Sequence, residues 1–113
     1  MKIDSYSFGS LVVDGKMYTS DVIMYPDRVD PSWWRKEGHR LQIDDLADVL
    51  NAKPQILIIG TGYSGMMAVS METESRIRSQ GIDIYVATTG RAVELFNTIK
   101  GKKTVIAALH LTC

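Results

Sequence analysis

The stretch from Pro54 to Gly65 limits the possible folds of this chain more than any other. After Pro54 and Gln55 come four apolar residues, Ile56 to Ile59, and then the glycine-rich exit Gly60-Thr61-Gly62-Tyr63-Ser64-Gly65. A short apolar run bounded by proline and glycine is typical of a strand buried on both faces. Such a strand needs cover above and below, so the sequence predicts a central strand of an α/β sheet. The glycine-rich exit then lies at the carboxyl edge, where open α/β sheets usually bind ligands.

The glycine-rich exit matches the dinucleotide-binding spacing Gly-x-Gly-x-x-Gly, but its context does not. Half of the chain precedes the strand, whereas a dinucleotide fold opens with it. The acid expected about 20 residues later would be Asp83, which starts the next strand and so lies at the wrong end to meet a ribose. A helix start is better signalled at Ser70, which is followed by an early acid. A dinucleotide cofactor is therefore not expected.

Two helix and strand pairs are predicted after this exit. Residues Ser70 to Gln80 are expected to form a helix that a glycine ends, and Ile82 to Thr88 the next strand. Because strand, helix and strand follow in this order, we expect a right-handed βαβ crossover with parallel strands. A second helix is predicted from Thr89, which we expect to cap it, to Gly101, and a last apolar strand from Thr104 to Leu111.

The first third of the chain is predicted to be antiparallel sheet. Within Ile3 to Tyr25, aromatic and small polar residues alternate with a period of two, which is typical of half-buried strands. The pair Asp14-Gly15 favours a tight hairpin because both positions tolerate positive φ. A loop from Pro26 to Gly38, a short strand and a helix from Asp44 to about Asn51 are expected before the central strand.

The composition argues against several classes of partner. The chain has 113 residues, enough for one compact domain over residues 1–113. Thirteen lysines and arginines balance thirteen aspartates and glutamates, so no net field favours nucleic acid. No apolar run is long enough to span a membrane and the start lacks a secretory signal, so we expect a cytoplasmic protein. The single cysteine, Cys113, cannot form an internal disulfide.

Several predicted features converge at the carboxyl edge of the parallel strands. The glycine turn and the start of the second helix meet there, because the carboxyl ends of parallel strands lie together. Free helix amides, a hydroxyl and an arginine favour a small anion, which is a phosphate, a nucleotide or a carboxylate. The candidate anion-binding residues are Gly60, Thr61, Gly62, Thr89 and Arg91. The alternatives are a small-anion site, conceivably of an enzyme, and a turn that is only structural.

The loop before Gly38 carries the other candidate, a protein-interaction surface. Trp33 and Trp34 stand beside Arg35, Lys36 and Glu37, and such mixtures of aromatic and basic residues are enriched at protein interfaces. The alternative is a lid that folds over the sheet, because most large aromatic side chains extend the core.

No catalytic set is indicated. Asp21 precedes a strand, where a lone acid is usually solvated or bonded within a turn. Two groups of residues could be taken for metal ligands. Asp44, Asp45 and Asp48 are explained more simply as a helix cap with a solvated face. His39, His110 and Cys113 are widely separated and lack the spacing of metal ligands. We therefore expect no catalytic residue, no metal and no cofactor.

An ordered set of residues along nearly the whole chain resembles one protein family. The set is Phe8-Gly9, Tyr18, Asp21-Val22, Pro26, Trp34, Gly38-His39, Ile59-Gly60-Thr61-Gly62, Gly81-Ile82, Thr89-x-x-Ala92-Val93, Phe96-Asn97 and Ala107-Ala108-Leu109-His110-x-Thr112-Cys113. No single motif is diagnostic, but the ordered set is. The chain thereby resembles the small α/β domain family that includes the human adipogenesis-associated domain protein and, more remotely, a mitochondrial respiratory complex I assembly factor.

The resemblance implies an α/β domain of three layers: a central mixed sheet with the βαβ unit, a smaller antiparallel sheet from the amino-terminal meander, and helices on the other face. It also implies that archaeal and bacterial members lack an assigned reaction, and it supplies no catalytic residues. Two functions stay open: a non-catalytic interaction or assembly module using Trp33 and Trp34, and a small-anion binding protein using the glycine turn.

Overall fold

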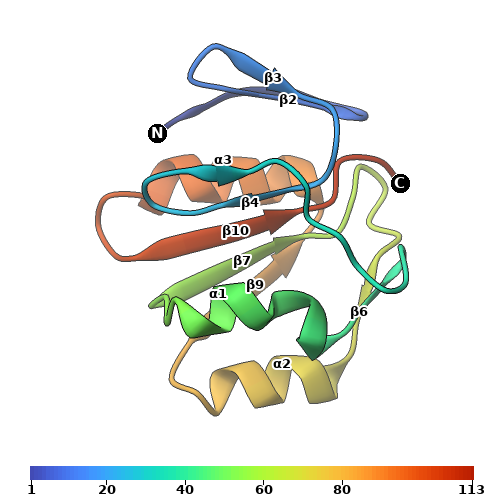
Figure 1. Cartoon of the computed structure of the whole chain (residues 1–113), viewed down its shortest axis with the longest axis vertical. Coiled ribbons are helices and arrows are strands. Elements are labelled where there is room, and N and C mark those ends of the chain that lie inside the picture. The colour runs from blue at the N-terminus through green and yellow to red at the C-terminus, as the bar shows by residue number, and fades with distance from the viewer.

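The computed structural model describes all residues from 1 to 113 and contains ten β-strands, three α-helices and one 3₁₀ helix, η1 (Figure 1). The elements in chain order are β1 Ile3–Ser7, β2 Ser10–Val13, β3 Lys16–Tyr18, β4 Val22–Met24, β5 Val29–Asp30, β6 Arg40–Leu41, η1 Ile43–Leu46, α1 Ala47–Asn51, β7 Ile56–Gly60, β8 Ala68–Val69, α2 Met71–Arg78, β9 Asp83–Ala87, α3 Thr89–Ile99 and β10 Val105–Leu109.

Five strands form the central sheet in the order β5-β4-β10-β7-β9. The strands β10, β7 and β9 are parallel, whereas β4 runs antiparallel to β10 and β5 antiparallel to β4. Every residue of β7 and β10 is buried, as the apolar runs of these segments predict. The parallel pair β7 and β9, joined through α2, is the predicted βαβ unit.

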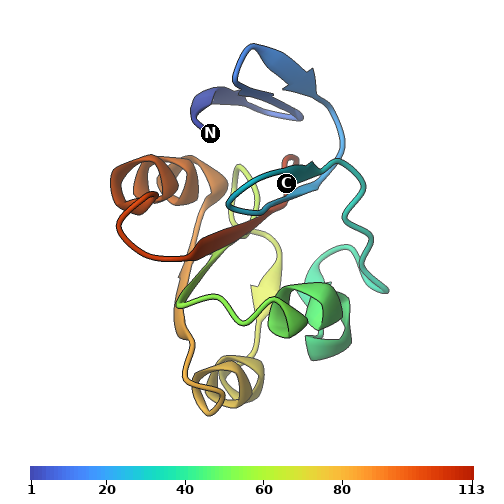
Figure 2. The same cartoon turned by 60° about the vertical axis from the view of Figure 1, so that its left-hand side comes forward.

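Two apolar cores lie on the two faces of this sheet. On one face Leu11 and Val13 of the meander and Phe96 of α3 pack against the sheet. On the other face Val49 of α1 and Ile77 of α2 do so. The α/β fold with a mixed central sheet and a smaller antiparallel sheet is therefore confirmed. Figures 1 and 2 show how the helices are divided, with α3 beside the meander and α1 and α2 across the sheet.

The small antiparallel sheet contains β1, β2 and β3 only. Asp14 and Gly15 both have positive φ, +47° and +82°, as expected for the predicted hairpin between β2 and β3. The last strand of the predicted meander, β4, leaves this sheet and pairs with β10 instead. Its three residues are all buried, because the central sheet gives an apolar strand cover on both faces.

Three local assignments differ from the prediction. Within the predicted loop from Pro26 to Gly38, Val29 and Asp30 form β5, because the central sheet extends past β4 and pairs with them. Thr88, not Thr89, is the N-cap residue of α3. Thr89 is the first residue of the helix, and its side chain is fully buried. Residues Ala68 and Val69, for which no strand was predicted, form the short strand β8, which pairs in parallel with β6. By contrast Ser70 caps α2 as predicted, because its side chain accepts a hydrogen bond from the amide of Thr73.

Asn97 fastens the meander to α3. Its Oδ1 accepts from the amide of Ile3 at 3.0 Å, and its Nδ2 donates to the carbonyl of Ile3 at 2.8 Å. The carboxamide thus satisfies both backbone groups of a residue of β1, as a neighbouring strand would.

We predict that Asn97→Asp lowers the free energy of unfolding by roughly 1–3 kcal/mol, because a carboxylate accepts from the Ile3 amide but presents a second acceptor to the Ile3 carbonyl. Chemical denaturation measures the change. Asn51→Asp is the control. Asn51 is exposed and, like Asn97, lies near the carboxyl end of a helix, so the added negative charge has the same unfavourable interaction with the helix dipole in both variants. Equal losses in the two variants would show that the Asn97 contacts contribute nothing.

Candidate functional site

The glycine turn follows β7 and packs against the start of α3. A Cβ placed on Gly60 would come within 2.9 Å of Thr89 Oγ1, so only glycine fits there. The amide of Gly62 donates to Thr89 Oγ1 at 2.9 Å, and the amide of Thr89 donates to the Gly62 carbonyl at 3.0 Å. The amide and the hydroxyl of Thr61 both donate to the carbonyl of Ala87. Gly60, Thr61, Gly62 and Thr89 therefore lie together at the carboxyl edge of the sheet.

The last residues of the sequence occupy this turn. The amide of Tyr63 donates to the carbonyl of Thr112 at 2.7 Å, and that of Met66 to the carbonyl of Cys113 at 2.9 Å. Gly62 has a φ of +110°, and a Cβ on it would overlap the carbonyl group of Cys113. Backbone carbonyls thus fill positions at which an anion would meet the amides of the turn.

Arg91 does not join the other predicted anion-binding residues. Its guanidinium is exposed and pairs with Glu94 on the same helix, with 3.5 Å between Nη1 and Oε2. The structure therefore places four of the five candidate residues side by side and directs the only charged one into solvent.

The two tryptophans have opposite environments. Trp33 is buried, with 7 % of its surface exposed, and its Nε1 donates to the carbonyl of Asp45 at 3.0 Å. Trp34 is 76 % exposed. Both side chains border a hollow of about 340 Å³ that is otherwise lined mainly by polar residues of the loop, η1 and α1. Trp33 thus packs inward, as the lid alternative predicts, and Trp34 is exposed, as the interface alternative predicts.

A buried ionic cluster lies at the same edge and was missed by the sequence analysis. Asp21 Oδ2 is 2.8 Å from Arg35 Nη2 and 2.8 Å from His110 Nδ1. Its other oxygen, Oδ1, accepts from the amide of Leu111 at 2.7 Å. Arg35 also donates to the carbonyl of Gly38, and its guanidinium lies over the ring of Trp33 at 4.5 Å. One carboxylate therefore holds the tryptophan loop and the end of β10.

These contacts decide the ionisation of Asp21. Burial by itself raises the pKa of the carboxyl group, but the hydrogen bonds from His110, the Leu111 amide and Arg35 together lower it below its ordinary value of 3.8. Asp21 is therefore a carboxylate at neutral pH, in an ion pair whose arginine side chain is only 4 % exposed.

Two polar atoms of the cluster have no partner. Arg35 Nη1 and His110 Nε2 are buried and make no hydrogen bond. Since Nδ1 of His110 faces the Asp21 carboxylate, Nε2 is a free acceptor in the neutral ring and a free donor in the protonated one. Unpartnered buried donors are rare in proteins and often mark a position that water or an ion fills.

Aromatic side chains cover the end of the chain beside this cluster. The hydroxyl of Tyr6 donates to the carbonyl of Leu111 at 2.9 Å, and burial raises the pKa of this phenol. The ring of Tyr63 lies 6.3 Å from that of Tyr6 and 5.9 Å, edge to face, from that of Phe8. The meander therefore contributes to the carboxyl edge as well as to the core.

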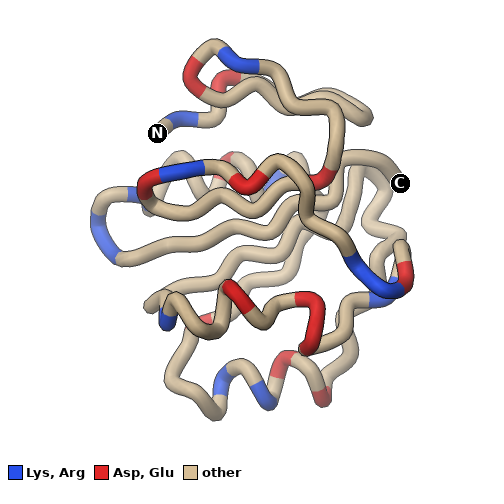
Figure 3. The backbone as a smooth tube through the Cα atoms, in the orientation of Figure 1, with Lys and Arg blue, Asp and Glu red and all other residues tan.

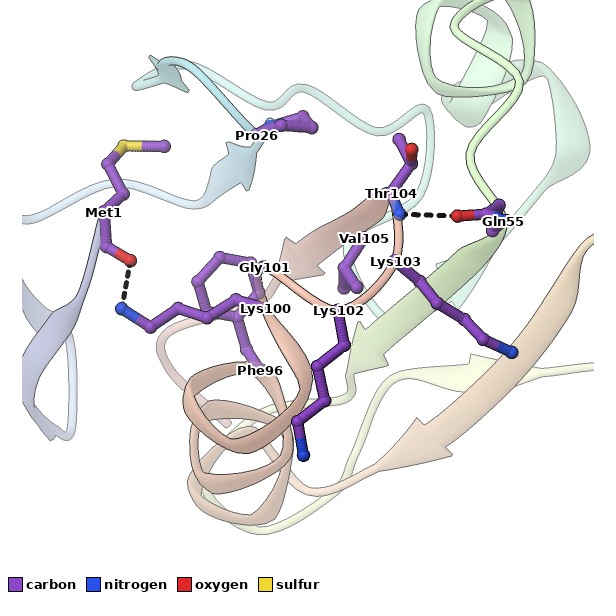
Figure 4. Close-up of a pocket in the computed structure, with 10 residues that line it drawn as sticks. All are labelled: Met1, Pro26, Gln55, Phe96, Lys100, Gly101, Lys102, Lys103, Thr104 and Val105. Atoms are coloured by element: carbon purple, nitrogen blue, oxygen red, sulfur yellow. Dashed lines mark hydrogen bonds between the residues drawn. The ribbon is translucent and has the colours of Figure 1, made fainter.

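The largest hollow, of about 620 Å³, lies at the opposite end of the parallel strands, where β7 and β10 begin (Figure 4). Three lysines border it, Lys100, Lys102 and Lys103. Lys100 donates to the carbonyl of Met1, and Figure 4 shows the amines of Lys102 and Lys103 pointing apart. Their charges do not converge on one point, so this hollow has no focus for an anion.

We predict that Asp21→Asn lowers the free energy of unfolding by roughly 3 kcal/mol at neutral pH, because it leaves a buried arginine without its counter-charge. The folded-state pKa of Asp21 is lowered, so its stabilisation is complete above about pH 4 and is lost as the pH falls through the folded pKa. Denaturation at several pH values measures this. The difference between wild type and variant should shrink below about pH 4; a difference that is constant with pH would contradict the ion pair.

Residues 3–110 match the sequence profile of a family described as a protein of unknown function, DUF498/DUF598. The fold is similar to that of the conserved hypothetical protein PH1505 from Pyrococcus horikoshii, with a TM-score of 0.85, 27 % identity and 100 % of each chain covered. It is also similar to the solved structure named MT938, with a TM-score of 0.82, 27 % identity, and 99 % of this chain and 98 % of that one covered.

A bacterial structure, XCC1710 from Xanthomonas campestris, shares the fold with a TM-score of 0.81 at 19 % identity, over 96 % of this chain and 83 % of that one. None of the helices here is both long and apolar enough to cross a membrane. The match to the profile covers nearly the whole chain, and the chain belongs to the DUF498/DUF598 family of unknown function.

Proposed function

We propose that this domain is a non-catalytic protein-interaction module that binds its partner through Trp34 and the hollow beside it. The observation that carries the proposal is the contrast between adjacent tryptophans, one buried and one 76 % exposed. Tryptophan is the residue type most enriched among the side chains that dominate interface energies.

The backbone around Trp34 is held on both sides. Before it, the amide of Trp33 donates to the carbonyl of Asp21 at 2.9 Å. After it, Arg35 is held by Asp21, and the amide of Lys36 donates to Asp45 Oδ1 at 3.1 Å. An aromatic side chain presented by an anchored loop loses little conformational freedom on binding, which favours affinity.

The charge around Trp34 favours a partner segment that is apolar and basic. The hollow is lined by four aspartates, against one lysine, Lys36. Figure 3 shows acidic residues along η1 and α1, which border it. The aspartates are Asp30, Asp44, Asp45 and Asp48. Complementary charge chiefly supports specificity and rate of association.

The family resemblance accords with this role. The ordered residues of the sequence resemble those of a family that we take to include the human adipogenesis-associated domain protein and a complex I assembly factor, whose roles concern differentiation and assembly. This domain is therefore proposed to act by contact with another protein.

We predict that Trp34→Ala reduces partner capture about tenfold or more without unfolding the domain, because the exposed side chain contributes to binding and not to the core. Tagged wild type and variant are compared by quantitative mass spectrometry after capture from a lysate of the source organism. The control is Met71→Ala, which removes another highly exposed apolar side chain from the start of α2. Proteins lost only with Trp34→Ala are the expected partners; equal capture by all three chains, each folded, would rule out this surface.

A second function, binding of a small phosphate or carboxylate, is favoured by the unpartnered Arg35 Nη1 and His110 Nε2. These atoms lie at the carboxyl edge together with Gly60, Thr61, Gly62 and Thr89. An anion there would accept hydrogen bonds from Arg35 Nη1 and, when both ring nitrogens carry hydrogen, from His110 Nε2. Arg91, paired with Glu94 in solvent, would then contribute little.

Titration with inorganic phosphate and with acetate tests this second function. We predict that one of them perturbs the imidazole signals of His110 in nuclear magnetic resonance spectra and raises the melting temperature, in the wild type and in Arg91→Ala alike. Loss of the effect in Arg91→Ala would move the site to the start of α3. Unchanged His110 signals and melting temperature with both anions would leave the cluster purely structural.

A further inference from the structure

The two edges of the central sheet are protected to different degrees. At one edge β5 has only two residues, and Pro31 follows it directly. At the other edge β9 has five residues, without proline or lysine. Proteins usually shield edge strands by shortness, proline, lysine or cover, because an open edge pairs readily with another strand. The strand β9 uses none of the first three.

The backbone of β9 offers free hydrogen-bonding groups on its outer side. The amide of Asp83 donates to Gln55, and the carbonyl of Ala87 accepts from Thr61, so both residues face β7. In a parallel ladder alternate residues face the same neighbour. The amides and carbonyls of Ile84 and Val86 therefore point outward, where the sheet has no further strand.

Side chains on both faces of this edge are also incompletely covered. Tyr85 is 47 % exposed and Val86, whose side chain points to the opposite face, is 37 % exposed. By contrast Ile84 is buried in the core beneath α2. An additional strand beside β9 would cover Tyr85 on one face and Val86 on the other.

We propose that β9 pairs antiparallel with β9 of a second copy of this chain, about a two-fold axis at Tyr85. In this register Ile84 of one copy faces Val86 of the other, and the pair exchanges both N–H···O=C bonds. The two-fold axis repeats this exchange on the other side. The two five-stranded sheets become one continuous sheet.

The second copy is the occupant because β9 is complementary to itself in this register. Both residues with free outward groups lie within the paired region, and each meets the other. Tyr85 meets Tyr85 of the second copy as a non-hydrogen-bonded pair, the closer of the two kinds, which suits two aromatic rings. A strand-edge contact of this length is small, so the dimer assembles reversibly with protein concentration.

Sedimentation equilibrium over a range of protein concentrations tests the proposal. The wild type is expected to shift from monomer to dimer as its concentration rises from micromolar to millimolar. Val86→Lys and Val86→Pro should remain monomeric, because the first puts a charge on the edge and the second removes an outward amide that β7 does not use. A wild type that is monomeric throughout, or a dimer that persists in folded Val86→Lys, would overturn the proposal.

Cross-linking tests the register. In a Cys113→Ser background, which removes the exposed native thiol, Tyr85→Cys should form a disulfide between copies under mild oxidation. Asp83→Cys is the matched control, because Asp83 faces Ala87 of the second copy and lies far from its own equivalent. Failure of Tyr85→Cys to cross-link at a concentration where the dimer forms would refute this pairing.

Discussion

The carboxylate of Asp21 is the contact on which the carboxyl edge of the domain depends. Asp21 lies just before β4. Its carboxylate contacts Arg35 of the tryptophan loop, and His110 and the amide of Leu111 after β10. Removing one member of such a buried group leaves an uncompensated charge, so the segments are fixed as a unit. The same carboxylate therefore determines both the closure of the glycine turn by the end of the chain and the position of Trp34.

Neighbouring residues of the tryptophan loop have two different roles, anchoring the loop and forming its exposed surface. Trp33 and Arg35 point inward and anchor the loop, and Trp34 between them points outward. The amides of the glycine turn, in contrast, already have partners within the protein. Thr61 donates to the Ala87 carbonyl, Gly62 to Thr89 Oγ1 and Tyr63 to the Thr112 carbonyl. An exposed, anchored aromatic beside an acidic hollow favours contact with another protein. The free atoms of Arg35 and His110 are the feature that keeps anion binding as the second candidate.

The fold was predictable because its strongest signals are local. The apolar run before Gly60, the Asp14-Gly15 turn and the Ser70 cap each specify an element from a few neighbouring residues, and all three are confirmed. The ionic cluster was not predicted, because Asp21 and His110 lie 89 residues apart and Arg35 is embedded in a polar loop. A topological signal existed: Asp21 precedes a strand antiparallel to β10, and His110 follows β10, so both must reach the same edge. That inference needed the pairing of β4 with β10, which the meander pattern did not indicate.

Amide hydrogen exchange of the Asp21→Asn variant tests the central claim most directly, because asparagine keeps the shape of the side chain and removes its charge. If Asp21 holds the edge together, the amides of Leu111, Trp33 and Lys36 exchange much faster in the variant, while those of β7 keep their protection. Faster exchange at Leu111 alone would limit the role of Asp21 to one hydrogen bond. Unchanged protection at Trp33 and Lys36 would contradict the claim that this carboxylate positions the loop that presents Trp34.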